Sequence, residues 1–148
     1  MEEIIPIGSD HAGYELKQNL IDYLEELGYE PEDMGTDRTE PVDYPDFAAA
    51  VAGAVSRGDR KRGILICGTG IGMSIAANKL PNVRAALAMD EHMAEISRRH
   101  NDANILTLGG RLLEPQKARK ILKKFLDSGY KAGRHVLRLK KITELELK

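Results

Sequence analysis

The segment Gly63–Asn78 holds the only cysteine of the chain beside a glycine-rich turn. A short apolar run ends at Cys67, and glycines follow at positions 68, 70 and 72. An apolar run bounded by glycine is typical of a buried strand. A strand, a glycine-rich turn and a helix N-terminus form an anion site, because backbone N–H groups and the positive end of the helix dipole converge there. The segment predicts a small anionic ligand, although a plain tight turn would leave the same pattern, and the spacing matches neither the Walker loop nor the dinucleotide fingerprint.

Two side chains in this segment are able to react. Thiolates are stabilised at helix N-termini, so Cys67 is a candidate nucleophile or base. The alternative is an inert buried cysteine at the end of a strand. Thr69 offers a hydroxyl two residues further on, and the alternative for Thr69 is a hydrogen bond within its own turn.

Charged groups elsewhere in the chain suit a phosphorylated ligand. Asp10 and His11 form an acid/base pair after the first apolar run, with a capping aspartate and an exposed histidine as the alternative. Arg134 and Arg138 are one helical turn apart, so the pair is able to clamp a phosphate. Arg111 follows two glycines and is a third candidate donor, although any one of these arginines could belong to a solvated surface.

The composition is that of a globular protein. Hydrophobic residues make up 42% of the 148 residues and charged residues 30%, which suffices for one core, so we expect one domain over residues 1–148. A net charge of −1 gives no reason to expect nucleic acid or a membrane as a partner. A single cysteine excludes an intramolecular disulfide and fits a reducing compartment. No signal sequence or membrane-length apolar run is apparent, so we expect a cytoplasmic protein.

Strand-like and helix-like segments alternate along the chain. We expect strands at Ile4–Gly8, Glu30–Gly35, Ile64–Cys67, Val83–Met89 and Ile105–Leu108. We expect helices at Tyr14–Leu27, Phe47–Val55, Met73–Leu80, Glu91–His100, Pro115–Leu126 and Arg134–Leu147. A polar loop, Thr36–Pro45, contains Tyr44.

This alternation predicts an α/β fold with a five-stranded parallel sheet between two layers of helices, three-layer and doubly wound in the Rossmann/flavodoxin-like manner. We expect the strand order 2-1-3-4-5 and an extra C-terminal helix. Ligands bind such sheets at the carboxyl ends of the strands beside the topological switch, here between the first and third strands. The loops at Ser9–Gly13 and Cys67–Gly72 therefore meet in one crevice.

His100 and Asn101 end the fourth predicted helix, which runs from the carboxyl ends of the strands to the opposite edge of the sheet. About ten residues at 1.5 Å each place His100 roughly 15 Å from the crevice of its own chain. One interpretation is a polar helix C-terminus, where the dipole favours histidine. If His100 instead belongs to the active site, it must serve the crevice of a neighbouring subunit, which predicts a dimer with shared sites.

Taken together, these motifs resemble the sugar-phosphate isomerase family that includes ribose-5-phosphate isomerase B and the subunits of galactose-6-phosphate isomerase. The resemblance covers almost the whole chain and rests on Asp10–Gly13, Cys67–Gly72, His100–Asp102, Gly133–His135 and Arg138. Ala132 departs from the family pattern, where a second glycine often stands before the Gly-Arg-His motif. Met73 stands where one branch of the family has a glutamate base, and the chain keeps Cys67, so it resembles the cysteine branch.

The resemblance implies interconversion of ribose 5-phosphate and ribulose 5-phosphate through a cis-enediolate, without metal or cofactor. Cys67 would move the proton between C1 and C2, and the amides of Gly68–Gly72 would stabilise the enediolate oxygen. Thr69 would handle protons on the substrate oxygens, and Asp10 and His100 would help to open the sugar ring. The implied substrate-binding residues are His11, Tyr44, Gly68, Gly70, Ile71, Gly72, Asn101, Arg111, Arg134 and Arg138.

Two alternatives remain at the level of the sequence. A six-carbon substrate, allose 6-phosphate or galactose 6-phosphate, would use the same chemistry in a deeper pocket. A non-catalytic phosphate-binding module would explain the glycine-rich loop but would leave Cys67, Thr69, His100 and the arginines without a shared purpose. The galactose enzyme needs two different subunits, so a chain with all the motifs favours a homodimer, with a tetramer as the larger option.

Overall fold

The computed structural model describes residues 2–146, and a parallel five-stranded sheet lies at its centre. The strands are β1 (Ile4–Ser9), β2 (Glu30–Asp33), β3 (Gly63–Cys67), β4 (Ala85–Leu87) and β5 (Ile105–Gly109). The helices are the short 3-10 turn η1 (His11–Gly13), α1 (Tyr14–Glu26), α2 (Tyr44–Ser56), α3 (Ile71–Ala77), α4 (Glu91–Arg99), α5 (Pro115–Asp127) and α6 (His135–Leu145). The predicted parallel sheet with helices on both faces is confirmed.

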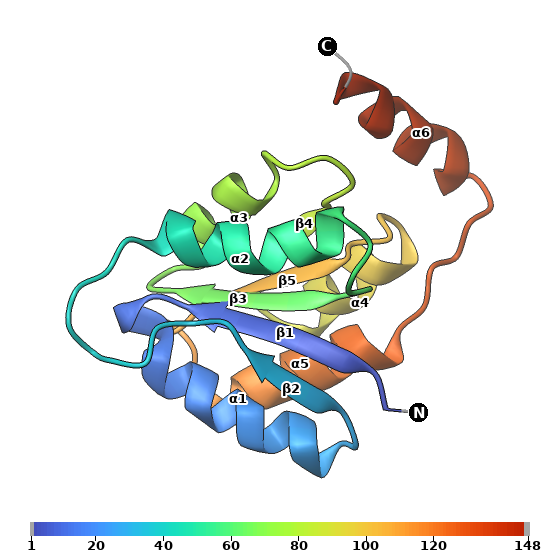
Figure 1. Cartoon of the computed structure of the whole chain (residues 1–148). Coiled ribbons are helices and arrows are strands. Elements are labelled where there is room, and N and C mark those ends of the chain that lie inside the picture. Colours follow the sequence, from blue (N-terminus) through green and yellow to red (C-terminus); the bar gives the residue numbers. More distant parts are fainter. Residues whose placement is uncertain (1, 147–148) are drawn as a thin grey trace.

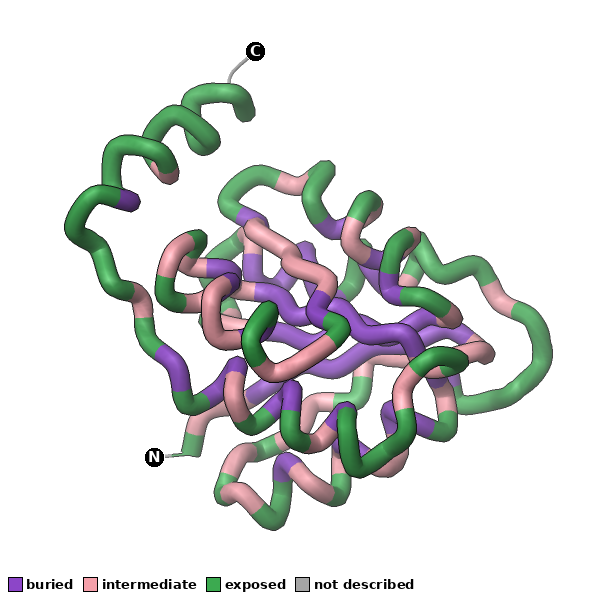
Figure 2. The backbone as a smooth tube through the Cα atoms, turned by 180° about the vertical axis from the view of Figure 1, so that it is seen from behind, coloured by how far each residue is buried: buried purple, intermediate pink, exposed green. Residues whose placement is uncertain are grey.

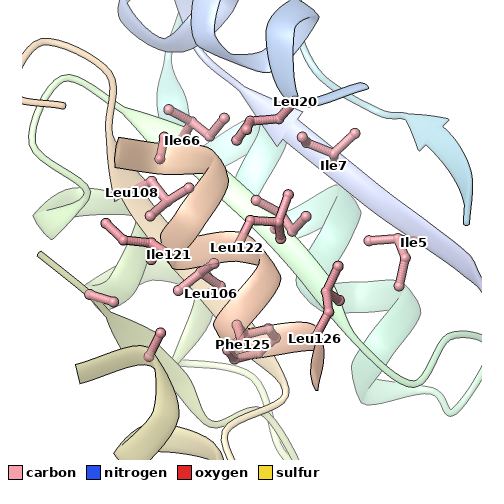
Figure 3. Packing of buried hydrophobic residues seen from close by; sticks show 14 of the residues in the cluster. Ile5, Ile7, Leu20, Ile66, Leu106, Leu108, Ile121, Leu122, Phe125 and Leu126 are labelled. Carbon is pink, nitrogen blue, oxygen red and sulfur yellow. The ribbon is translucent and has the colours of Figure 1, made fainter. Parts of the chain in front are cut away.

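Helices cover both faces of the sheet, with α2 and α3 on one side and α1 and α5 on the other (Figure 1). The strands β3 and β5 are buried along their whole length, as expected for central strands with continuous apolar runs. Helix α5 begins at Pro115, in the first turn where proline is tolerated. The buried face of α5 repeats every three or four residues and packs on β1, β3 and β5 (Figure 3); its largest members are Ile121, Leu122, Phe125 and Leu126. Each such side chain contributes about 1.5–3 kcal/mol on burial.

The expected strand order was wrong for its last two strands. The observed order is β2-β1-β3-β5-β4, with β5 inside the sheet and β4 at its edge. Parallel crossovers are almost always right-handed, so the face on which a helix lies depends on the direction of its crossover. Helix α4 packs beside α5 on the face that α1 covers, so the crossover from β4 to β5 runs across the sheet in the same direction as the crossover from β1 to β2. This direction takes the chain from β4 at the edge back toward the centre of the sheet. The lengths and burial of the two strands agree with this order, since the edge strand β4 has 3 residues of intermediate burial and the inner strand β5 has 5 buried residues.

Several predicted boundaries also needed correction. Tyr44 was expected in a loop but is the first residue of α2, with Pro45 in the first turn. Helix α3 begins at Ile71 rather than Met73, because Gly70 has a φ of 84° and starts the helix directly after the turn. Strand β4 is shorter than the expected Val83–Met89. The expected end of the last helix, Leu147, lies outside the described residues, and α6 is observed over His135–Leu145.

The C-terminal helix α6 stands apart from the three layers (Figure 1). Its backbone is exposed along almost its whole length (Figure 2), and only His135, at its start, is buried. Four large apolar side chains of α6 face solvent: Val136, Leu137, Ile142 and Leu145. Large apolar side chains gathered on one exposed helix mark a candidate interaction surface.

Candidate active site

The loops after β1, β3 and β5 are joined at the carboxyl edge of the sheet. The amide of Asp10 donates to the carbonyl of Ile66 at 3.3 Å, which ties the first loop to β3. The amide of Gly110 donates to the carbonyl of Cys67 at 2.7 Å, and the amide of Arg111 donates to that of Gly68 at 3.0 Å. Three neighbouring loops therefore meet around the end of β3, and we call this meeting point the crevice.

Cys67 is the last residue of β3, and its thiol lies under the glycine-rich turn. The backbone amide of Gly70 donates a hydrogen bond to Cys67 Sγ at 3.2 Å, and the cysteine is 5% exposed. A cysteine acts as a base or nucleophile through its sulfur, which is the atom that this donor contacts. Gly70 makes this contact in a left-handed conformation (φ 84°) that side chains rarely adopt. The turn therefore provides a buried sulfur with a fixed N–H donor.

Thr69 lies exposed on the same turn. Its Oγ1 accepts a hydrogen bond from the amide of Ile71 at 3.2 Å, which is the local arrangement that the sequence left open. A hydroxyl that accepts one hydrogen bond keeps its own proton to donate. Thr69 therefore remains able to exchange a proton with a ligand in the crevice.

Asp10 caps the short helical turn η1. Its Oδ1 accepts from the amides of Ala12 at 2.9 Å and Gly13 at 3.1 Å, and the residue is 6% exposed. The alternative of a capping aspartate therefore describes its geometry. Hydrogen bonds from two amides leave the carboxylate further lone pairs, so capping does not prevent it from accepting a hydrogen bond from a ligand.

His11 is held by a contact that sequence reasoning missed. Its Nδ1 accepts a hydrogen bond from the backbone amide of Val42, 31 residues away in the loop before α2, at 3.1 Å. An Nδ1 that accepts must be unprotonated, so the proton of the neutral ring is assigned to Nε2. Nε2–H is then a donor suited to an anionic group. No sequence signal pointed to Val42, because its backbone rather than its side chain makes the contact.

Glycines at the turn make room for two of the predicted binding residues. A Cβ placed on Gly72 would lie 2.6 Å from Cζ of Tyr44 and 3.0 Å from its hydroxyl oxygen, so the ring packs directly on α3. A Cβ on Gly68 would lie 3.5 Å from Nη1 of Arg111, which places this guanidinium over the turn. The crevice thus unites ten of the residues predicted from the sequence: Asp10, His11, Tyr44, Cys67, Gly68, Thr69, Gly70, Ile71, Gly72 and Arg111.

His100 lies at the other edge of the sheet. It caps the C-terminus of α4, five residues before β5 begins at Ile105. Cys67 pairs with Gly109 at the far end of β5, and Gly63 pairs with Ile105 at the near end. Four strand steps at about 3.3 Å each separate the two ends by roughly 13 Å. His100 therefore lies far from the crevice of its own chain, in agreement with the distance predicted from the sequence.

The remaining predicted residues gather around His100. The amide of Lys131 donates to the carbonyl of Arg99 at 2.9 Å, and this contact brings the segment that leads to α6 against the end of α4. The rings of His100 and His135 stack with centroids 4.3 Å apart and an interplanar angle of 21°. We call the set His100, Asn101, Arg134, His135 and Arg138 the His100 group. Sequence reasoning missed the stacking role of His135, for which its place between the two arginines was the only signal.

The pKa of His135 is lowered in the folded chain. Burial lowers the pKa of His135 from its ordinary value of 6.5, and the nearby positive charges of His100, Arg134 and Arg138 lower it further. His135 is 8% exposed and lies at the start of α6, the helix that stands apart from the layers. The direction is that of a histidine among cations, and such a cluster suits an anionic ligand.

Within residues 2–146, no three or more histidine, cysteine, aspartate or glutamate side chains are grouped so as to hold a metal ion. None of the helices in the same range has the length and apolar character needed to span a membrane.

Comparison with known proteins identifies the class to which this fold and crevice belong. A family model described as Ribose/Galactose Isomerase matches residues 5–142. Ribose-5-phosphate isomerase B of Escherichia coli is 44% identical over 142 residues, which cover 96% of this chain and 95% of that protein. A putative sugar phosphate isomerase of Bacillus subtilis is 47% identical over 145 residues, or 97% of each chain.

Solved structures give the same result. The ribose-5-phosphate isomerase B of Clostridium thermocellum is 51% identical, with a TM-score of 0.95 over 97% of each chain. The type B ribose 5-phosphate isomerase of Trypanosoma brucei is 45% identical, with a TM-score of 0.95 over 99% of this chain and 100% of that one. The chain belongs to the Ribose/Galactose Isomerase family.

Proposed function

We propose that this protein interconverts ribose 5-phosphate and ribulose 5-phosphate, with Cys67 as the base. Its relatives in Escherichia coli and Clostridium thermocellum are named ribose-5-phosphate isomerase B. The single observation that carries the proposal is the position of Cys67 Sγ, which accepts the Gly70 amide where the loops that carry Asp10 and Arg111 meet. A reducing cytoplasm keeps such a lone thiol free, and this is the compartment that we expect.

The reaction follows from this geometry. The Cys67 thiolate removes the proton from C2 of the open-chain aldose, and the electron pair forms the C1–C2 double bond of a cis-enediolate with negative charge on O1. The thiol then returns its proton to C1, while the proton on O2 passes to O1 with the help of Thr69. Amides of residues 68–72 other than those of Gly70 and Ile71, which bond Cys67 and Thr69, would stabilise the developing charge. One such donor is typically worth about 10²–10³ in kcat.

The other residues serve the ring and the phosphate. We assign Asp10 and His100 to opening of the furanose ring, and Asn101 and Tyr44 to the sugar hydroxyls. The phosphate ligands are then His11, through Nε2–H, and the three arginines Arg111, Arg134 and Arg138. Arginine suits this role because its planar fork donates two parallel hydrogen bonds to phosphate oxygens.

A second copy of the chain completes the site. Because His100 and Cys67 lie at opposite edges of the sheet, each crevice must receive the His100 group of another subunit, and a homodimer is the smallest assembly that allows this. The exposed apolar side chains of α6 support the proposal, as do Ile71 and Ile75, which are exposed on α3 beside the crevice. A groove of about 610 Å³ between α6 and the β4 edge, lined by Ile142, Leu145 and Asn101 among others, offers further surface for a partner.

The test of the catalytic assignment is Cys67→Ala measured beside wild type on three substrates. Loss of a general base costs about 10²–10⁴-fold in kcat, whereas binding of ribose 5-phosphate, measured by calorimetry, should persist. Unchanged turnover would remove Cys67 from the mechanism. Ribose 5-phosphate should have a higher kcat/KM than allose 6-phosphate or galactose 6-phosphate, and the reverse order would assign a six-carbon substrate.

Mixed dimers test the shared site. A dimer of one Cys67→Ala chain and one His100→Asn chain has one intact site. In that site, Cys67 comes from the His100→Asn chain and His100 comes from the Cys67→Ala chain. Heterodimers carrying two different tags and purified through both should recover about half of the wild-type activity per dimer. No recovery in such verified heterodimers would contradict the sharing of the site.

A further inference from the structure

The turn that carries His100 and Asn101 has an unusual backbone. Asp102, the next residue, has a φ of 47°, which is in the left-handed region that non-glycine residues rarely adopt. Such a conformation persists only where the surrounding contacts determine it. The contacts that hold this turn therefore also decide where His100 and Asn101 lie.

Two arginines hold the turn from both sides. Arg98 donates from Nη1 to Oδ1 of Asp102 at 3.1 Å and to the carbonyl of Ala103 at 2.6 Å. Arg84 donates from Nε to the carbonyl of Asp102 at 2.8 Å and from Nη2 to its Oδ2 at 3.4 Å. Both carboxylate oxygens and two successive carbonyls are thus satisfied by guanidinium donors. This pattern fixes the backbone of the turn as well as the Asp102 side chain.

Arg98 also reaches the segment that leads to α6. Its Nε donates to the carbonyl of Ser128, just after α5, at 3.3 Å. Its guanidinium lies 5.7 Å from the centre of the Phe125 ring, and the side chain is only 13% exposed. The amide of Lys131, three residues after Ser128, bonds the carbonyl of Arg99. One largely buried guanidinium therefore connects the His100 turn to the segment that carries Arg134 and Arg138.

We propose that Arg98 is a positioning residue for the isomerase reaction, which holds the two parts of the His100 group together so that they reach a second copy's crevice as one rigid unit. The proposal rests on the proposed function, because it assumes that the His100 group serves the crevice of a partner. Arg98 itself belongs to neither the crevice nor the exposed surface of the His100 group, so it acts through the residues that it holds.

Lysine is not equivalent to arginine at this position. Arg98 uses Nε and Nη1 to reach Asp102, Ala103 and Ser128, whereas a lysine has one ammonium at a single point. Burial lowers the pKa of Arg98, and the charge of Asp102 opposes this, so the ion pair supports the buried cation. The neighbouring Arg99 is a matched control, since its side chain is about half exposed and pairs with Glu95 on the surface of α4.

The first measurement compares Arg98→Lys with Arg99→Lys. A displacement of about 1 Å in a catalytic group can cost about 10²-fold in rate. We therefore expect the Arg98→Lys homodimer to lose about ten-fold or more in kcat, and Arg99→Lys to retain the wild-type rate. An Arg98→Lys homodimer with wild-type kcat would overturn the proposal.

Mixed dimers separate positioning from a general loss of structure. When an Arg98→Lys chain is paired with a Cys67→Ala chain, the Arg98→Lys chain supplies the only intact crevice and the Cys67→Ala chain supplies an unperturbed His100 group to it. The activity should therefore equal that of the Cys67→Ala and His100→Asn pair. In a dimer with His100→Asn, the only complete His100 group comes from the Arg98→Lys chain, so the activity should stay low. Equal activity of the two mixtures would overturn the role of Arg98.

The same set of mixtures distinguishes the two proposals. Failure of the Cys67→Ala and His100→Asn pair would refute the shared site and, with it, this role of Arg98. If the Cys67→Ala and His100→Asn pair recovers activity but the two Arg98→Lys mixtures have equal activity, only the role of Arg98 is refuted. Asp102→Asn perturbs the same ion pair from its other side and should give the same pattern in the same two mixtures, so the test does not depend on the folding of one variant.

Discussion

Replacing Gly70 with alanine should damage both the stability and the catalytic turn, because two separate constraints act on this position. Its φ of 84° is strained for any side chain. A Cβ would also lie 2.6 Å from Cδ1 of Leu87 and 3.0 Å from the carbonyl carbon of Leu108. The first of these contacts is the end of a side chain, which can move. The second is the backbone of β5, which cannot move without disturbing the sheet.

The magnitude follows from these two terms. A left-handed alanine costs about 1–2 kcal/mol relative to its usual conformation. Crowding against a packed interior adds about 1–3 kcal/mol, so Gly70→Ala should lower the free energy of unfolding by about 2–5 kcal/mol. Gly58 offers a matched control, because its φ is 83° and a Cβ there meets nothing within 4 Å. Gly58→Ala should cost the conformational term alone.

Urea unfolding followed by circular dichroism measures both variants. All samples should have one protein concentration, because association makes the apparent stability depend on concentration. Under conditions where the variants are folded, Gly70→Ala should also lose about 10²–10³-fold in kcat, since it displaces the amide that faces Cys67 Sγ. Gly58 follows α2 at the opposite edge of the sheet, so Gly58→Ala should retain its kcat. Equal destabilisation by the two variants, or a normal kcat in Gly70→Ala, would refute the geometry of the turn.

Three other predictions concern separate parts of the chain. His100→Asn should lose about 10²–10⁴-fold in kcat with ribose 5-phosphate but far less with ribulose 5-phosphate, which is already open because its O5 carries the phosphate; equal losses in initial rates would argue against ring opening. The pKa of His135 is lower in the folded chain than its ordinary 6.5, so the unfolded chain binds the proton more tightly. As the pH falls from 7 through 6.5 toward that lowered pKa, the free energy of unfolding of wild type should decrease relative to that of His135→Gln. Parallel curves of stability against pH for the two proteins would contradict this. Lys17 is fully buried and donates to both oxygens of the half-exposed Asp33. Asp33→Ala leaves this buried cation unpaired, whereas Lys17→Met removes it, so Asp33→Ala should lower the free energy of unfolding by about 1–3 kcal/mol more than Lys17→Met. A larger loss for Lys17→Met would refute this reasoning.

The parts of the site that the sequence predicted are those that depend on local pattern. Cys67 and its glycines are contiguous, and the end of a parallel strand faces the same edge wherever the strand lies in the sheet. The loop after β1 could therefore be brought to the crevice from the strand pattern alone. The position of His100 followed in the same way from the direction and length of one helix.

The parts that sequence reasoning missed depend on contacts between distant segments. The amide of Val42 bonds His11 across 31 residues, and nothing in a loop sequence marks one amide as a donor. The stacking of His100 on His135 depends on where the segment after α5 lies, which periodicity does not indicate. Arg98 carries no motif at all, because a guanidinium bound to carbonyls uses acceptors that every residue possesses.

The error in strand order has a consequence for the chemistry. In the expected order, β4 would separate β5 from β3, and Arg111 would lie about 5 Å further from Cys67, since neighbouring strands are about 4.8 Å apart. In the observed order, Cys67 pairs with Gly109, and the chain beyond β5 crosses directly over the glycine-rich turn.

The two glycines before Arg111 make this approach sterically feasible. A Cβ on Gly109 would lie 2.8 Å from the carbonyl oxygen of Thr69, and one on Gly110 would lie 2.8 Å from that of Ala12. The crossover from β4 back toward the centre is therefore what brings a guanidinium into the crevice. The same crossover, through α4, carries His100 to the opposite edge of the sheet. The reversal in the path of the chain thus accounts for the guanidinium beside Cys67. The position of His100 follows instead from the length of α4, and the proposed homodimer would bring this imidazole to the crevice of a second copy.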